Sequence, residues 1–346
     1  MTERLLTVIT PFYNSIKYLD TTISSLLNQT YRNWEYICVD DCSTDGTLEK
    51  LREYAAKDPR IRVIAREKNS GSAAGGFNTG MLAAKGTHIQ ILGHDDALSP
   101  DLLENIAKRL DETNADIVIP DARIVAKEVS EDAETFDCIG ITPSRKQKDR
   151  FKPNDRSVVL TGREAFSLSI NWRIHGWACF STDLIRRCGQ MEEQYMNADE
   201  LWTRTLYLNA GKVVFCTGQY VYLKRKESLS TKMNAKSFDV FRVQKKVLGL
   251  LKTHKFGRKE LNIWKKDSCL RLQHYTYRYY FNKDLFSPED QKKAEELLHQ
   301  AKKMVFRECR DTLCYYLTAL KIRKNLCRYK KFLRLKNKLQ KNGIIL

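Results

Sequence analysis

The sequence predicts an α/β fold of the doubly wound kind, followed by an α-helical extension. In the first 100 residues, short apolar runs rich in β-branched residues alternate with helical patterns, whereas beyond residue 224 the patterns are helical and rich in Lys. At roughly 100–200 residues per domain, a length of 346 residues also favours two units. We therefore expect one domain over residues 1–225 and a second over residues 226–346.

Four short apolar segments have the composition of buried strands, and three helical patterns separate them. The strands are expected at residues 5–10, 34–39, 61–65 and 88–92, and the helices at residues 20–29, 47–54 and 73–84. Because strands separated by helices of this length need right-handed crossovers, they form a mainly parallel sheet with helices on both faces.

The extension contains three further helical patterns. Two are expected at residues 237–251 and 259–281. The third begins at Ser287, where a capping residue is followed by Pro288 and by two acidic residues. This order is typical of the start of a helix, because Pro is tolerated at the first helical position and acidic groups favour the first turn.

The net charge of +18 is distributed unevenly along the chain. Residues 1–220 carry a net charge of −4, and residues 221–346 carry +22. A charge of +18 first suggests a partner such as nucleic acid or a membrane surface. Because all of the excess positive charge lies in residues 221–346, such a partner is expected to bind the extension alone.

The ten cysteines include no CxxC pair and no Cys/His cluster with zinc-finger spacing. Several lie within apolar runs, so we expect reduced, mostly buried thiols in a cytosolic protein. No run of about 18 uncharged apolar residues occurs, and we therefore expect no transmembrane span.

Acidic pairs follow two of the predicted strands. Asp40-Asp41 follows the second strand, and Asp95-Asp96 follows the fourth. The carboxyl ends of parallel strands meet at one edge of a sheet, where ligands bind. Carboxylates packed together repel one another unless a divalent cation or hydrogen-bond donors lie between them. Helix capping explains either pair alone, but it explains both together less well.

The motifs around these pairs resemble the family 2 glycosyltransferases with the GT-A fold. The resemblance rests on TVITPFYNSIKYLDTTISSLLNQTYRNWEYICVDDCSTDGT, on NSGSAAGGFNTGMLAAKG and on GHDDALSPDLLE, all within residues 5–110. It implies inverting transfer of a sugar from a nucleotide-sugar, expected to be a UDP-sugar, to an acceptor hydroxyl. It also implies a divalent cation, Mn2+ or Mg2+, at the diphosphate and a role in the synthesis of capsule or lipopolysaccharide.

The resemblance also assigns residues to the nucleotide-sugar site. They are Pro11, Phe12, Tyr13, Asp40, Asp41, Asn69, Gly71, Asn78 and Asp95. Either Asp40 or Asp41 is expected to bind the uracil edge. Asp95 and Asp96 are the expected metal ligands, although Gly93 replaces the first Asp of the family motif.

An inverting transferase also needs a base to take the proton of the acceptor hydroxyl. The family places this carboxylate at the start of a helix, and Asp199 is our first candidate and Glu200 our second. Ala198 replaces the usual Glu, so the register is open, and both acids could instead serve only the helix dipole. His175 and Trp177 are candidates for the acceptor side, with core packing of the Trp as the alternative.

The end of the chain predicts an amphipathic helix with a basic face. Between residues 321 and 341, Lys and Arg alternate with apolar residues at spacings of three and four. Such a helix suits anionic lipid headgroups. We therefore expect a cytoplasmic enzyme on the inner face of the cell membrane that acts on a glycan or lipid-linked acceptor. A solvated face packed on the catalytic domain or on another copy is the second reading, and nucleic acid is the least favoured partner.

Two other function classes remain open from the sequence. Nucleotidyl transfer also uses acidic pairs and metals on α/β sheets, but the first loop lacks a Gly-rich basic signature. A membrane- or polyanion-binding scaffold with a decayed catalytic domain is the non-enzymatic alternative, which Gly93 in place of Asp allows.

Overall fold

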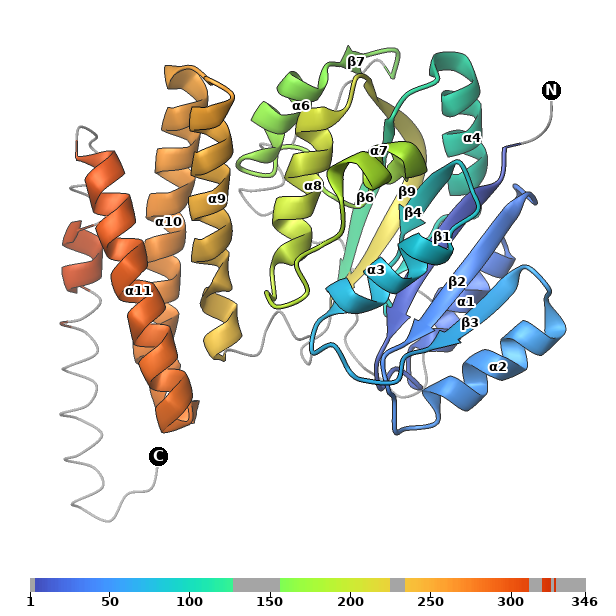
Figure 1. Ribbon diagram of the computed structural model, residues 1–346, viewed down its shortest axis with the longest axis horizontal. Helices are drawn as coiled ribbons and strands as arrows, with labels where there is room; N and C mark the ends of the chain where they lie inside the picture. The colour runs from blue at the N-terminus through green and yellow to red at the C-terminus, as the bar shows by residue number, and fades with distance from the viewer. Residues whose placement is uncertain (1–3, 127–155, 225–233, 311–318, 325–326, 328–346) are drawn as a thin grey trace. The chain divides into compact units, whose positions relative to one another are not determined.

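The computed structural model describes residues 4–126, 156–224, 234–310, 319–324 and 327 (Figure 1). The chain divides into two compact units, residues 1–228 and residues 229–346. Within the described ranges, none of the helices has both the length and the apolar character needed to cross a membrane.

The first unit is built on a mixed sheet whose first half is parallel. Its strands are β1 (Leu6–Phe12), β2 (Trp34–Asp40), β3 (Ile61–Ala65) and β4 (His88–Ile91), arranged in the order β3-β2-β1-β4. All three pairings in this half are parallel. The predicted strands and the α/β fold class are therefore confirmed, with boundaries that move by one or two residues.

The second half of the sheet contains antiparallel pairings that the sequence patterns do not predict. Its strands are β5 (Ala97–Leu98), β6 (Ile117–Ala126), β7 (Val159–Leu160), β8 (Cys179–Ser181) and β9 (Val213–Lys224). Strand β8 pairs antiparallel with both β4 and β6, and β6 pairs parallel with β9. The short β5 and β7 both pair antiparallel with β9.

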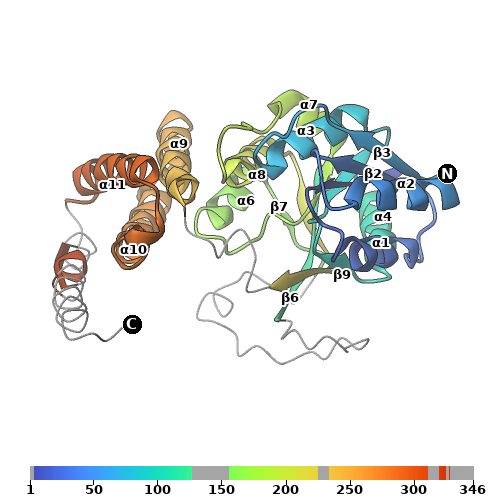
Figure 2. The ribbon, with the colours of Figure 1, turned by 90° about the horizontal axis from the view of Figure 1, so that it is seen from below.

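Helices cover both faces of this sheet (Figures 1 and 2). They are α1 (Leu19–Leu27), α2 (Thr47–Lys57), α3 (Ala73–Ala83), α4 (Leu102–Thr113), α6 (Gly162–Ser169), α7 (Thr182–Cys188) and α8 (Ala198–Asn209). Alternate residues of β1 face opposite sides, as expected for a strand. Val8 lies in a core cluster with residues of α1 and α4, whereas Ile9 faces α3.

Glycines let α3 lie close to β1. A Cβ atom at Gly80 would collide with the side chain of Ile9, and one at Gly76 would collide with Pro11. Larger residues would push the helix away from the sheet. This close packing fixes the position of the N-terminal end of α3, which contributes to the site described below.

The second unit is helical. Its elements are η1 (Ala235–Asp239), α9 (Val240–Thr253), α10 (Arg258–Asn282), η2 (Lys283–Leu285) and α11 (Pro288–Cys309). They bury a core that includes Phe238, Leu272 and Tyr279. The predicted start of α11 is confirmed, because the Ser287 hydroxyl caps the helix by accepting a hydrogen bond from the backbone N–H of Asp290 (3.1 Å).

The cysteines that the structure describes are free thiols, and five of them are buried. Burial raises the pKa of Cys216 to about 12 and raises the pKa of Cys38 and Cys179 further. Such thiols remain protonated at neutral pH and behave as small apolar side chains.

Candidate active site

The pairing register brings the ends of the parallel strands to one edge of the sheet. Phe12 at the end of β1 lies opposite Asp40 at the end of β2, and Asp40 lies opposite Ala65 at the end of β3. On the other side, Ile9 of β1 lies opposite Ile91 at the end of β4. The loops that follow these strands therefore gather at the same edge.

The three residues predicted to lie against the base in the first loop have different environments. Phe12 is fully buried in the core cluster, and Pro11 is buried against Gly76 of α3. Tyr13 is 51% exposed. Of these three side chains, only that of Tyr13 presents a ring surface to a ligand.

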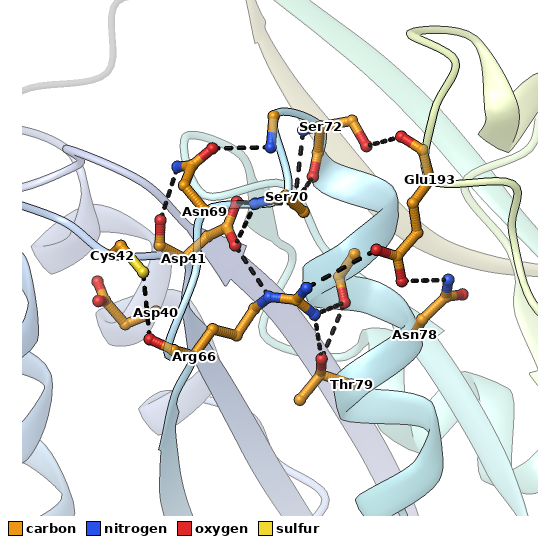
Figure 3. Close-up of polar contacts among 12 residues, drawn as sticks. Asp40, Asp41, Cys42, Arg66, Asn69, Ser70, Ser72, Asn78, Thr79 and Glu193 are labelled. Atoms are coloured by element: carbon orange, nitrogen blue, oxygen red, sulfur yellow. Dashed lines mark hydrogen bonds and ion pairs between the residues drawn. The ribbon is translucent and has the colours of Figure 1, made fainter.

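The two members of the first acidic pair are bound differently (Figure 3). Asp41 accepts hydrogen bonds from the backbone N–H of Ser70 (3.0 and 3.1 Å) and from its hydroxyl (2.8 Å), and it forms an ion pair with Nε of Arg66 (3.0 Å). Asp40 is 1% exposed and accepts one hydrogen bond at Oδ2 from the backbone N–H of Ser43 (3.1 Å). Its other oxygen, Oδ1, is buried without a partner among the described residues. Asp40 thus has an acceptor to offer, while both oxygens of Asp41 are already engaged.

Asn69 and Gly71 shape the loop between β3 and α3. Asn69 donates from Nδ2 to the backbone carbonyl of Asp41 (2.7 Å) and accepts at Oδ1 from the backbone N–H of Gly71 (2.7 Å). Gly71 has a φ angle of +72°, which favours glycine. This loop places the donors of Ser70 on Asp41.

The second acidic pair lies on a tight turn after β4. The backbone N–H of Asp96 donates to the carbonyl of Gly93 (3.2 Å), and the buried hydroxyl of Thr22 lies within hydrogen-bond distance of the carbonyls of His94 (3.0 Å) and Asp96 (2.8 Å). The Asp96 carboxylate is 4% exposed. It accepts from the hydroxyl of Tyr220 (2.6 Å) and from the backbone N–H of Leu223 (3.0 Å).

The position of Asp96 explains why glycine occupies position 93. A Cβ atom at Gly93 would lie 2.5 Å from Oδ2 of Asp96. Any larger residue there would displace the carboxylate from Tyr220, whose hydroxyl also accepts from the backbone N–H of Gly93 (3.0 Å). The glycine in place of the family's first Asp is therefore coupled to the inward orientation of Asp96.

The two predicted metal ligands differ in accessibility. Asp95 is half-buried, whereas Asp96 is buried and hydrogen-bonded inside the protein. Within the described ranges, no group of three or more His, Cys, Asp or Glu side chains could hold a metal by itself. One accessible carboxylate fits a cation of the Mg2+ type only if diphosphate oxygens and water complete the coordination, which is a common arrangement for such ions.

The two candidate bases both lie in the first turn of α8 but have different partners. Glu200 is paired with Arg204 one turn later (3.3 Å) and also accepts from the side chain of Asn197 (3.3 Å). Arg204 is fully buried and stacks on the ring of Trp172 at 3.9 Å. Glu200 therefore compensates a buried charge.

Asp199 is exposed to solvent. Desolvation by surrounding atoms and, to a lesser degree, the adjacent Glu200 carboxylate raise the pKa of Asp199 to about 6. A carboxylate with this pKa is ionised at neutral pH and still basic enough to take up a proton. This is the property that a general base requires.

The acceptor-side candidates belong to an aromatic group. The ring of Trp177 stacks on the rings of Tyr220 (5.2 Å) and Tyr222 (5.1 Å), and His175 lies 5.5 Å from Trp177. Nε2 of His175 donates to the carbonyl of Pro120 (2.8 Å). Tyr220 connects this group to Asp96. Contact of His175 and Trp177 with an acceptor stays a prediction.

Sequence reasoning missed Arg66, Tyr220 and Glu193. Arg66 directly follows β3, so the rule that ligands gather at strand ends, applied to the third strand as well, would have found it. Its guanidinium contacts Asp41, the carbonyl of Gly75 (2.7 Å) and Glu193 (3.7 Å). Neither Tyr220 nor Glu193 has a local signal, because each reaches the site from a distant part of the chain.

This fold and site have counterparts among known proteins. The S. aureus TarS 1–349 structure in complex with UDP-GlcNAc superimposes with a TM-score of 0.63 and 21% identity, covering 95% of this chain and 91% of that one. The similarity assigns the GT-A fold, the fold of one large class of glycosyltransferases. Residues 7–174 match the family described as Glycosyl transferase family 2. Residues 7–174 are therefore similar to a family 2 glycosyltransferase domain.

Relatives of known sequence agree with this assignment. TuaG of Bacillus subtilis, named for teichuronic acid biosynthesis, is 44% identical over 100 residues, and glycosyltransferase GlyG of Streptococcus pneumoniae is 40% identical over 117 residues. The matches cover 29% and 34% of this chain and 39% and 38% of those relatives. The chain thus spans about two fifths of the length of each.

The Asp96–Tyr220 contact generates a prediction about stability. Tyr220→Phe leaves the buried Asp96 carboxylate without one donor and the Gly93 N–H without its acceptor, so we expect a loss of about 1–3 kcal/mol in the free energy of unfolding. Tyr222→Phe, which removes the same atom two residues along β9, is the matched control and is expected to cost much less. Denaturant unfolding of both variants measures this difference, and equal losses would contradict the role assigned to the Tyr220 hydroxyl.

Proposed function

We propose that this chain transfers a sugar from a UDP-sugar to an acceptor hydroxyl, with inversion at the anomeric carbon and with the help of a divalent cation. The observation that carries the proposal is the position of Asp199, an exposed carboxylate in the first turn of α8 whose acidic neighbour, Glu200, is engaged by the buried Arg204. The family match favours sugar transfer over nucleotidyl transfer.

Asp199 is the proposed general base. Its carboxylate takes the proton of the acceptor hydroxyl while the hydroxyl oxygen attacks the anomeric carbon and the bond to UDP breaks on the opposite side. Glu200 is not available for this step, because its ion pair with Arg204 compensates a buried guanidinium. Its proposed role is to hold the first turn of α8 in place.

Asp40 is the proposed acceptor for the nucleobase. Its Oδ1 atom is buried without a partner among the described residues, and such an atom is costly unless a ligand donor completes it. The N–H of a uracil ring is a donor of the right kind. Tyr13, exposed at the end of β1, offers a ring on which the base can stack.

Asp95 is the proposed metal ligand, with Asp96 as a support for the turn that carries it. A Mn2+ or Mg2+ ion bound there would neutralise the diphosphate as it leaves. Asp96 orients the turn through Tyr220 and Leu223. The relative TuaG, which is named for teichuronic acid biosynthesis, supports a glycan acceptor on the cell surface.

We also propose that the extension attaches the enzyme to an anionic membrane surface. Most of the predicted basic helix lies outside the described residues. Its described part, residues 319–324, is helical and exposes Lys321, Arg323 and Lys324. These cations support attraction to anionic lipid headgroups.

Titration with UDP tests the nucleotide site. We expect saturable binding that Mn2+ strengthens, because Asp95 and the diphosphate share the cation. Asp40→Asn should weaken UDP binding about tenfold or more, by loss of a buried charged acceptor. Asp95→Asn should remove only the gain from Mn2+, and Asp183→Asn, at an exposed position on α7, is the control. Absence of UDP binding by the unmutated protein would instead support a non-catalytic scaffold.

Replacement of the proposed base tests the chemistry. Asp199→Asn should lower kcat about 10²- to 10⁴-fold with little change in UDP affinity, because only proton transfer is lost. Glu200→Gln should retain most of the activity and lose about 1–3 kcal/mol of stability. The rate of the unmutated enzyme should rise with pH through about 6, where Asp199 becomes ionised, and then level off. A rate independent of Asp199 would refute the assignment.

Flotation with liposomes tests the membrane proposal. The unmutated chain should float with vesicles containing an anionic lipid and not with neutral ones, and added salt should release it. Replacing Lys321, Arg323 and Lys324 by Gln should reduce flotation, since these exposed cations face solvent. A variant with Lys292, Lys293 and Lys303 of α11 replaced by Gln has the same change in charge and should float as before. Equal flotation of the two variants would contradict a role for the terminal helix.

A further inference from the structure

We propose that Asn78 is a positioning residue for the base: it holds the segment from Gly189 to Asn197, and through it Asp199, in place for transfer. This inference rests on the proposed function of Asp199. It gives Asn78 a role different from the contact with the nucleotide that the sequence suggests. The proposal rests on the hydrogen bonds of the Asn78 side chain to Met191 and Glu193.

The segment between α7 and α8 consists of turns and irregular backbone rather than helix or strand. Among the described contacts, the N–H of Tyr195 donates to the carbonyl of Glu192 (3.3 Å), and the indole N–H of Trp202 donates to the carbonyl of Gly189 (3.0 Å). A connection of this kind needs outside contacts to adopt one conformation. Only Ala198 separates its end from Asp199.

Asn78 supplies the central contact. Its Oδ1 atom accepts from the backbone N–H of Met191 (2.9 Å), and its Nδ2 atom donates to the carbonyl of the same residue (2.9 Å). Nδ2 also donates to Oε1 of Glu193 (3.0 Å). Both N–H groups of the amide and its carbonyl oxygen are thereby used. All hydrogen-bonding groups of this buried side chain are engaged by the segment, so we propose that it does not bind the nucleotide as well.

Further contacts bind the same segment to the edge of the sheet (Figure 3). The hydroxyl of Ser72 donates to the backbone carbonyl of Glu193 (2.8 Å), and the Glu193 carboxylate lies 3.7 Å from Nη2 of Arg66. A Cβ atom at Gly75 would lie 3.1 Å from Oε2 of Glu193, so the segment approaches α3 closely. Asn78 therefore binds the segment that precedes α8 to α3, the helix that follows the loop of Asn69 and Gly71.

An isosteric substitution breaks this arrangement selectively. Asn78→Asp keeps the shape of the side chain but removes both donors, and it places a carboxylate against the carbonyl of Met191 and the carboxylate of Glu193. The three groups are all acceptors, so the segment is expected to move away from α3. A displacement of about 1 Å of a catalytic group costs about 100-fold in rate.

Kinetics with UDP-GlcNAc as the probe donor and UDP titration together test the role. For Asn78→Asp we expect kcat for donor cleavage to fall about 10- to 100-fold. The affinity for UDP should change by less than about twofold, and the midpoint of the pH–rate profile should move away from about 6 because the surroundings of Asp199 change. Ser72→Ala, a milder loss at the same segment, should lower kcat in the same direction and keeps the test valid if Asn78→Asp does not fold. Asn209→Asp, at the exposed end of α8, is the matched control.

The outcomes separate this inference from the proposed function. If the unmutated protein neither binds UDP nor cleaves the donor, the proposed function fails. If it does both and the Asn78 and Ser72 variants keep its kcat and pH profile, only the positioning role is refuted. A loss of UDP affinity as large as the loss of rate would likewise overturn it, by making Asn78 a nucleotide contact.

Discussion

The convergence of acidic side chains at one edge of the sheet constrains the rest of the site. Asp40, Asp41 and Asp96 are all buried there. Burying a carboxylate is costly unless hydrogen-bond donors or an opposite charge compensate it. Arg66 and Ser70 compensate Asp41, and Tyr220 and Leu223 compensate Asp96. The loops adopt conformations that bring these donors to the carboxylates. The Oδ1 atom of Asp40 has no donor among the described residues, and it marks where a ligand is expected.

The division of labour within each acidic pair could not be predicted from the sequence. The pattern of strands places both pairs at strand ends, and the structure has them there. Which member is engaged depends on partners that arrive from far along the chain: Arg66 and Ser70 from the loop after β3, and Tyr220 from β9. Two adjacent Asp residues have the same side chain, so residue type does not distinguish them. They differ in the direction of their side chains, which the backbone conformation sets.

Local sequence patterns do not reveal contacts between distant parts of the chain, and this also explains which strands the sequence predicts. Strands β1 to β4 are separated by helices of nine to eleven residues, so strand and helix patterns alternate and the elements can be recognised. Strands β5, β7 and β8 contain only two or three residues, too few for any period to be read. They exist because neighbouring strands offer unpaired backbone groups, which is a tertiary effect. The antiparallel pairings that these short strands make therefore appear only in the structure.

The open register at the start of α8 illustrates how helix geometry can decide between neighbouring acids. Residues four apart lie on the same face of a helix, so an Arg at position 204 can pair with Glu200 and not with Asp199. Since Arg204 is fully buried and stacked on Trp172, the acid that faces it has a structural task. The acid one residue earlier points about 100° away around the helix and reaches solvent. The ELWTR pattern thus pairs Glu200 with the buried Arg204 and leaves Asp199 exposed, which is why Asp199 is the acid that we propose as the base.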